Sequence, residues 1–206
     1  MHSRILILIM TLGVSGCATL DRDSCLTADW QLIGFNDGVA GYEASRLEQH
    51  RDACSEYGIA PQMDDYLQGY DRGVSRYCTA TNGYRTARAG KQLNAVCSGG
   101  PGLAFVRGFE LGSVAHKQAV QLADAERELS TMRSEQRSDD RELNEKREQL
   151  VADGISTQAR SFLLLEIDAL QHDMRVRATA IKRQKQAVQM ERHYLKDLES
   201  DLRQQL

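Results

Sequence analysis

The chain has 206 residues, with 26 Lys and Arg against 29 Asp and Glu, which gives a formal net charge of −3. A hydrophobic fraction of 41% excludes a wholly disordered chain, and the acidic balance argues against general nucleic-acid binding, which needs a cationic surface. Residues 17–112 hold 13 of the 16 glycines, both prolines and all five cysteines, whereas residues 113–206 hold a single glycine. This uneven composition predicts two regions of different structure.

Residues 1–16 have the features of a secretory signal peptide. Arg4 precedes an apolar stretch of ten residues, which rises about 15 Å as a helix and is therefore too short to span a bilayer. The stretch ends in Val14-Ser15-Gly16-Cys17, which resembles the lipobox of bacterial lipoproteins. The resemblance implies cleavage before Cys17, acylation of Cys17, and membrane attachment through its lipid. The alternative is an ordinary signal peptide with Cys17 as a free thiol.

The residues after Cys17 also bear on location. Ala18 and Thr19 follow, without the aspartate that resembles an inner-membrane retention signal. We therefore expect attachment to the outer membrane, on its periplasmic face, with residues 17–24 forming a lipidated linker.

The other four cysteines predict two disulfides. An even number of cysteines in an exported chain suits the oxidising periplasm, and no C-x-x-C pair or neighbouring histidine indicates a metal site. Three pairings are possible. A continuous helix over residues 28–57 would separate the first two cysteines by about 40 Å, while a break at Gly38 or Gly41 would allow them to pair. The candidates are Cys25, Cys54, Cys78 and Cys97.

A short motif recurs within residues 25–112. Each copy has the pattern Gly-aromatic-polar-x-Gly, which places two glycines on one face of a helix. Because glycine weakens a helix by about 1 kcal/mol relative to alanine, matched glycines indicate close packing between helix backbones. We expect three such helices, with packing glycines at Gly34, Gly38, Gly69, Gly73, Gly108 and Gly112.

The boundaries of these helices follow from caps and turns. Thr27 is expected to cap a helix that runs to about residue 57, and Pro61 separates it from a second helix over about residues 62–78. The Asn82-Gly83 pair predicts a turn in a loop over residues 79–97 that holds a short helical piece. Residues 98–102 are expected to be a flexible joint, so that a disulfide-bonded domain covers residues 25–102.

Residues 25–112 resemble a family of proteobacterial lipoproteins known only as a domain of unknown function (2799). The resemblance implies an exported, lipid-anchored, α-rich protein with the C-terminal helices as a variable extension, and it brings no activity or catalytic residue. The matching positions are Trp30, Gly34, Asp37, Gly38, Gly41, His50, Cys54, Gly58, Tyr66, Gly69, Gly73, Tyr77, Cys78, Gly83, Tyr84, Gly90 and Cys97.

Residues 103–206 predict a long antiparallel coiled-coil hairpin. Apolar residues recur in alternating steps of four and three, although polar residues interrupt both seams. Gly154 is placed to end one helix and Ser156 to cap the next, which puts the turn at residues 152–156. The first arm is acidic, with a net charge of −3 over residues 113–153, and the second is basic, with +2 over residues 154–206. The predicted fold class is therefore all-α, a small glycine-rich disulfide-bonded domain followed by this hairpin.

Three functions are compatible with this organisation. We favour a non-enzymatic envelope lipoprotein, without a cofactor, whose hairpin acts as a spacer or docking arm. Because two helices bury only a narrow apolar stripe, residues 113–206 are expected to bind an envelope protein or to self-associate.

The second candidate is a module that binds peptidoglycan or another glycan through aromatic faces and arginines. The same aromatics can instead form the core of a domain poor in Leu and Ile. The residues concerned are Trp30, Tyr42, Tyr57, Tyr66, Tyr70, Tyr77, Tyr84, Arg72, Arg76, Arg85 and Arg88.

The third candidate is an enzyme. The titratable cluster in its favour is His50, Asp52, Asp64 and Asp65, and no hydrolase or metalloprotease motif accompanies it. We therefore expect no catalytic residue and no metal ligand.

Overall fold

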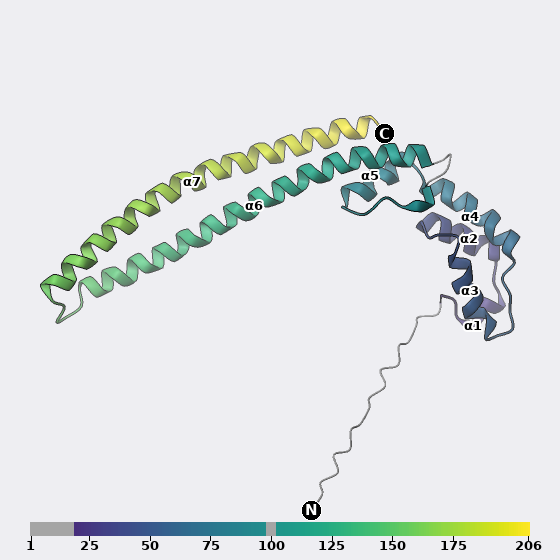
Figure 1. Ribbon diagram of the computed structural model, residues 1–206, viewed down its shortest axis with the longest axis horizontal. Helices are drawn as coiled ribbons and strands as arrows, with labels where there is room; N and C mark the ends of the chain where they lie inside the picture. The colour runs from purple at the N-terminus through teal and green to yellow at the C-terminus, as the bar shows by residue number, and fades with distance from the viewer. Residues whose placement is uncertain (1–18, 98–101) are drawn as a thin grey trace, which may run out of the picture. The chain divides into compact units, whose positions relative to one another are not determined.

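The computed structural model describes residues 19–97 and 102–206, and the regular structure within these ranges is entirely helical (Figure 1). The predicted all-α class is confirmed. The described residues form two compact units, one within Met1–Thr79 and Asn94–Gly102 (unit 1) and the other of Ala80–Leu93 with Leu103–Leu206 (unit 2). The helices are α1 (Arg22–Leu26), α2 (Trp30–Ala40), α3 (Arg46–Ser55), α4 (Met63–Tyr77), α5 (Ala80–Arg88), the short 3-10 helix η1 (Ala95–Cys97), α6 (Gly102–Leu150) and α7 (Thr157–Gln204).

The expected single helix from Thr27 to residue 57 is wrong, because two helices occupy this stretch. Asp29 rather than Thr27 caps α2, and its carboxylate accepts a hydrogen bond from the Leu32 backbone N–H at 2.9 Å. Gly41 ends α2 with a φ of +75°, a left-handed conformation that glycine adopts without a steric penalty. The chain then turns and begins again as α3.

The predicted helix over residues 62–78 is confirmed by α4, but the predicted turn at Asn82-Gly83 is wrong. Both residues lie inside α5. Local turn preference is overridden here by packing, because Gly83 is buried against α6. Of the expected joint at residues 98–102, residues 98–101 lie outside the described residues, and Gly102 is the first residue of α6 rather than part of a joint.

Within unit 1, α2 and α4 cross with their backbones in direct contact. A Cβ added at Gly34 would lie less than 3.0 Å from the Tyr66 carbonyl oxygen, and one at Gly69 would lie equally close to the Gln31 carbonyl oxygen. Each oxygen belongs to the residue three positions before the partner glycine. The second glycines of the two motifs, Gly38 and Gly73, repeat this relation one turn later. The crossing is therefore approximately two-fold symmetric, and any side chain at these positions would force the helices apart.

Unit 2 contains a crossing of the same kind between α5 and α6. A Cβ at Gly83 would clash with the Phe105 carbonyl oxygen, and a Cβ at Gly108 would clash with that of Ala80. The partner of Gly112 is the Tyr84 carbonyl oxygen, three residues before Ala87. Residues 83–87 are thus a fourth copy of the motif, in which alanine replaces the second glycine. This fourth copy was not among the three predicted from the sequence.

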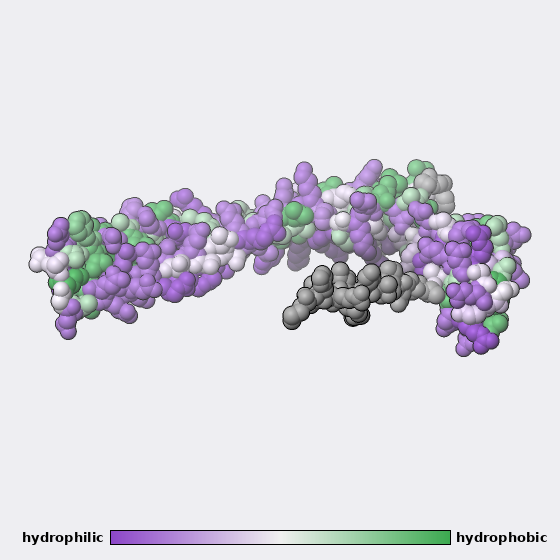
Figure 2. All heavy atoms as spheres, turned by 60° about the horizontal axis from the view of Figure 1, so that its bottom comes forward, coloured by the Kyte–Doolittle hydropathy of each residue, from purple (hydrophilic) through white to green (hydrophobic). Residues whose placement is uncertain are grey.

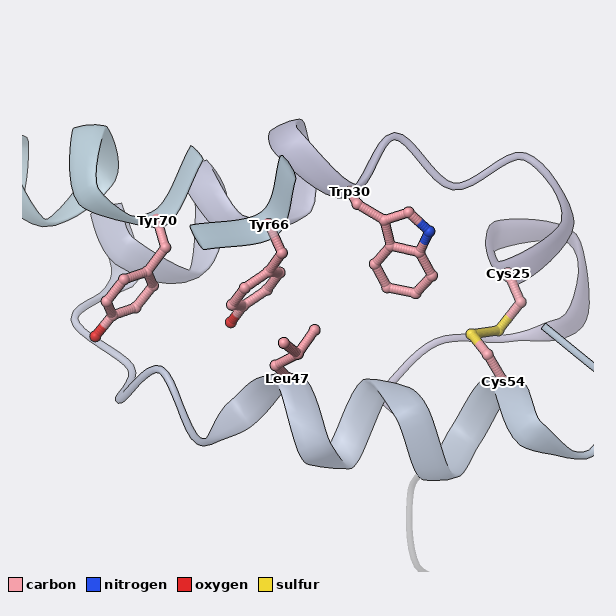
Figure 3. Packing of buried hydrophobic residues seen from close by; sticks show 6 residues of the cluster. All are labelled: Cys25, Trp30, Leu47, Cys54, Tyr66 and Tyr70. Carbon is pink, nitrogen blue, oxygen red and sulfur yellow. A yellow bond between two sulfur atoms is a disulfide. The ribbon is translucent and has the colours of Figure 1, made fainter. Parts of the chain in front are cut away.

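The core of unit 1 is small and rich in aromatic residues (Figure 3). Trp30 and Leu47 pack with Tyr66 and Tyr70, whose rings stack with their centroids 6.1 Å apart. Four of the seven aromatics that carry the glycan-binding alternative are interior, whereas Tyr42 and Tyr57 are exposed. Trp30, Tyr66, Tyr70 and Tyr84 are all less than 9% exposed.

Within unit 2, α6 and α7 form the long antiparallel hairpin that the sequence predicts (Figure 1). Gly154 has a φ of +78° at the turn, and the Ser156 hydroxyl caps α7 by accepting from the Ala159 backbone N–H at 3.1 Å. Seam residues such as Leu129, Ile167 and Val188 are buried at 9% exposure or less. In the described ranges, no helix combines the length and apolar character needed to cross a membrane.

Candidate functional site

Two disulfides stabilise unit 1. Cys25 bonds to Cys54 and Cys78 bonds to Cys97, with Cα–Cα distances of 5.5 and 5.4 Å. The first bond joins α1 to the end of α3, which the turn at Gly41 makes possible. The sequence left three pairings open, and the structure selects this one.

A buried polar cluster lies beside the aromatic core. The Asp37 carboxylate accepts a hydrogen bond from the Tyr66 hydroxyl at 2.8 Å and lies 2.7 Å from Nε2 of His50. Arg46 adds an ion pair, with Nε 3.3 Å from the other carboxylate oxygen. Asp37 is 7% exposed and His50 3% exposed, so the carboxylate is compensated by three partners rather than by water. This cluster joins α2, α3 and α4.

The second ring nitrogen of His50 holds the segment before α1. Nδ1 of His50 and the Thr19 hydroxyl oxygen are 2.8 Å apart, and Leu20 packs against the aromatic core. Asp21 then caps α1 through a 2.8 Å hydrogen bond from the Ser24 backbone N–H. Hydrogen bonds from the Ser24 side chain and from the Ser24 backbone N–H lower the pKa of Asp21. The chain is therefore bound to unit 1 from Thr19 onward.

A carboxylate, an imidazole and a hydroxyl in series can activate the hydroxyl as a nucleophile, but their surroundings here do not favour such chemistry. His50 is almost completely buried and its ring nitrogens contact Thr19 and Asp37, whereas the other expected titratable residues, Asp52, Asp64 and Asp65, are exposed. Burial and the hydrogen bond to Asp37 raise the pKa of Tyr66 well above its usual range. The cluster is suited to holding helices together. No group of three potential metal ligands occurs in the described part of the chain.

A cavity of about 560 Å³ opens on the surface of unit 1 between α2 and α4. Its walls combine Phe35 and Leu32 with two arginines one helical turn apart, Arg72 and Arg76. The other lining residues are Gln31, Ser75 and Asp29, whose carboxylate caps α2. Two guanidinium groups beside an aromatic ring are suited to a carboxylate-bearing ligand with a flat face. Of the arginines named for glycan binding, these two meet at one site, whereas Arg88 is paired with Glu199 at 2.6 Å in unit 2.

Charged side chains join the two arms of the hairpin. Arg177 on α7 contacts Asp139 at 2.8 Å and Glu135, both on α6, and Lys146 on α6 contacts Glu166 on α7 at 2.8 Å. The Glu166 hydrogen bond raises the pKa of Lys146. Three polar seam residues of α6, Gln118, Asp139 and Lys146, thus have partners on the opposite arm.

The end of the hairpin is apolar on its surface (Figure 2). Val151 beside the turn is 76% exposed, and on the first turns of α7 Phe162, Leu164 and Leu165 are 59%, 52% and 69% exposed. Exposed apolar side chains gathered in this way are typical of surfaces that bind another molecule.

Residue 17 and the signal sequence lie outside the described residues, so their predicted roles stay predictions. No curated protein and no solved structure matches the chain. Residues 29–114 match the family described as protein of unknown function (DUF2799). This match confirms the resemblance to the domain of unknown function 2799, and the glycine motifs all lie within the matched residues. Residues 29–114, from the start of α2 into α6, therefore form a DUF2799 domain, a domain of unknown function.

Proposed function

We propose that this protein is a non-enzymatic, lipid-anchored protein of the bacterial envelope whose hairpin is a docking arm. The observation that carries the proposal is the hairpin itself. Its helices contain 49 and 48 residues, and at 1.5 Å per residue each is about 73 Å long. A hairpin of this length, with apolar side chains exposed near its turn, supports a role in reaching and binding another envelope component rather than in catalysis.

The residues that follow Cys17 determine how closely such an anchor would hold the folded domain. Thr19 and Leu20 are already bound to unit 1, and Cys25 is tied to α3 by a disulfide. An acyl group on Cys17 would therefore hold unit 1 at the membrane surface with almost no free linker. Two disulfides in one domain are also typical of proteins that fold in an oxidising compartment.

Membrane fractionation and crosslinking test this proposal together. The native protein is expected in the outer-membrane fraction with a lipid mass on Cys17, and Cys17→Ala is expected in the soluble periplasmic fraction. Crosslinking in intact cells should capture a partner through α7, and Leu165→Asp near the turn should reduce that capture. Lys185→Asp, which also adds an acidic side chain to exposed α7 surface, is the control. An unmodified Cys17 would exclude the anchor. Equal capture of a partner by the native protein, Leu165→Asp and Lys185→Asp would exclude the docking role of the hairpin.

The cavity between α2 and α4 supports a second candidate, binding of a carboxylate-bearing glycan such as peptidoglycan. Binding of the soluble protein to isolated cell walls should fall about tenfold or more in Arg72→Ser/Arg76→Ser, because one charge-assisted pair contributes about 1.5–3 kcal/mol. Arg133→Ser/Arg137→Ser, with two exposed arginines four residues apart on α6, should bind normally. Equal binding by both variants would exclude this site.

A further inference from the structure

α7 carries a second apolar line besides the one in the hairpin seam. The seam follows Ile167, Val188 and Leu195, which are buried against α6. The second line also advances in alternating steps of four and three, so that its residues share one flank of the helix. Its members are Phe162, Glu166, Ala169, Asp173, Val176, Ala180, Arg183, Ala187, Met190 and Tyr194.

The large side chains of this α7 flank are exposed. Phe162, Val176, Met190 and Tyr194 are 59%, 58%, 67% and 57% exposed. The middle of the flank borders a groove between the two arms, lined by Met132, Asp173, Val176, Arg177 and Ala180. A second groove is lined by the seam residues Leu129 and Val188, by Ser130, and by four charged residues, Glu126, Arg133, Arg137 and Arg192. The first groove has fewer charged residues in its lining, so it is the better suited of these two to an apolar partner helix.

The α7 flank is complementary to the same flank of a second, antiparallel copy when residue 178 of one copy lies opposite residue 178 of the other. In such a pairing Phe162 lies opposite Tyr194, Ala169 opposite Ala187, and Val176 opposite Ala180. The two charged residues near the centre, Asp173 and Arg183, also lie opposite each other. Glu166 would face Met190, and Glu166 already has Lys146 of its own hairpin as a partner. A two-fold axis places one surface against an identical one, so it requires this kind of self-complementarity.

We propose that the α7 flank binds the α7 flank of a second copy of this chain, antiparallel and about a two-fold axis near residue 178. Asp173 of each copy then pairs with Arg183 of the other, and these two ion pairs fix the register, as charged and polar positions do in coiled coils. The inference deepens the proposed docking function, on which it rests, by naming a second copy as the partner of the arm.

The apolar area agrees with a weak dimer. Large side chains present about 150–250 Å² when fully exposed, so the four exposed members give roughly 400–500 Å² per copy. Two copies therefore approach the lower limit of about 1,000 Å² for a specific interface. We therefore expect a dissociation constant in the micromolar range for this dimer.

Sedimentation equilibrium of the full-length Cys17→Ala protein tests the proposal over about 1–100 µM, which brackets such an affinity. The protein should change from monomer to dimer across this range. Asp173→Arg and Arg183→Asp should each weaken the dimer by at least about tenfold, because like charges then face each other at both pairs. The double variant, which exchanges the charges, should restore the dimer to within about threefold.

The matched control exchanges charges on another face of α7. Asp168 and Arg175 are exposed, lie seven residues apart, and make no side-chain ion pair with any described residue. Asp168→Arg and Arg175→Asp should leave the association constant unchanged. Circular dichroism should show the same helix content in all variants, because each altered side chain is on the surface.

Three results would overturn the inference: a monomer at every concentration, a dimer that is indifferent to either single charge reversal, or a double variant that stays monomeric while folded. These outcomes are separate from those of the proposed function. Capture of another envelope protein by a strictly monomeric chain would remove this inference alone. A dimer with an unmodified Cys17 in cells would remove the lipid anchor alone.

Discussion

Replacing Gly69 by alanine tests whether α2 and α4 touch through their backbones. A Cβ at position 69 would lie less than 3.0 Å from both the carbonyl carbon and the carbonyl oxygen of Gln31. Ordinary contact begins near 3.4 Å, and backbone atoms cannot rotate away as a flexible side chain can. The helices must therefore separate by about 1 Å or more along a crossing that holds four glycines.

The expected cost follows from two opposing effects. Overpacking of this kind destabilises by about 1–3 kcal/mol, and a rigid obstacle places it at the upper end. Alanine returns about 1 kcal/mol through its higher helix propensity. The free energy of unfolding should therefore fall by about 2 kcal/mol, which corresponds to roughly 4–8 °C in Tm for a chain of this length.

Urea unfolding of the oxidised protein, followed by circular dichroism, measures this change. Ser75→Ala is the matched control, because Ser75 is an exposed residue of the same helix whose hydroxyl bonds only to the Asp71 carbonyl at 2.9 Å. Its unfolding free energy should change by less than about 0.5 kcal/mol. If Gly69→Ala were as stable as the native protein, or more stable, the close approach of α2 and α4 would be refuted.

Four further perturbations have defined outcomes. Tyr84→Phe should be neutral or stabilising by up to about 1 kcal/mol in urea unfolding, because the buried Tyr84 hydroxyl has no hydrogen-bond partner among the described residues; a loss above 1 kcal/mol would contradict this. Cys78→Ser/Cys97→Ser opens a loop of 19 residues and should lower the unfolding free energy by about 3 kcal/mol, and an unchanged urea midpoint would argue against the bond. The free energy of unfolding should be constant up to about pH 9 and fall above pH 10, the usual tyrosine pKa. Burial raises the folded-state pKa of Tyr66 and Tyr70, so the unfolded chain loses those protons first. Absorbance at 295 nm should show two tyrosines that ionise late, and simultaneous ionisation of all seven would exclude the burial. Arg177→Ala removes two ion pairs to α6 and should cost about 1 kcal/mol, whereas Arg175→Ala on the exposed side should cost almost nothing; equal losses would show that the ion pairs contribute nothing specific.

The hairpin could be predicted from sequence because its signals are local. Gly154 and Ser156 mark the turn within three residues, and the seven-residue repeat marks which side of each arm is buried. The glycine motifs could also be recognised from local sequence, because two glycines four residues apart lie on one face of a helix. Which motif pairs with which could not be predicted, because every copy presents nearly the same surface.

The fourth motif was missed because two local rules pointed elsewhere. Asn-Gly favours turns, and Ala87 stands where the other copies have a second glycine. Only the contact with Phe105 shows that Gly83 is a packing glycine. The usable signal was Tyr84, an aromatic directly after the glycine as in the other three copies.

The buried cluster around Asp37 was beyond sequence reasoning. His50 is 13 residues from Asp37 and reaches it only because Gly41 reverses the chain between α2 and α3. Thr19 is 31 residues from His50. A carboxylate inside a glycine motif was the available hint, because an Asp on a packed face needs partners from neighbouring helices.

Because the five-residue glycine motif occurs four times, the unfolded chain can pair its motif helices in more than one way. Any two of the four copies can in principle build the same crossing, and four helices can be sorted into couples in three ways. The disulfides Cys25–Cys54 and Cys78–Cys97 close loops that contain α2 and α5, and so restrict the conformations that the unfolded chain can reach around these two helices. If the protein is reduced and refolded without an oxidant, long-lived isomers with wrongly paired helices should therefore form. These kinetic traps are a consequence of the repeated motif.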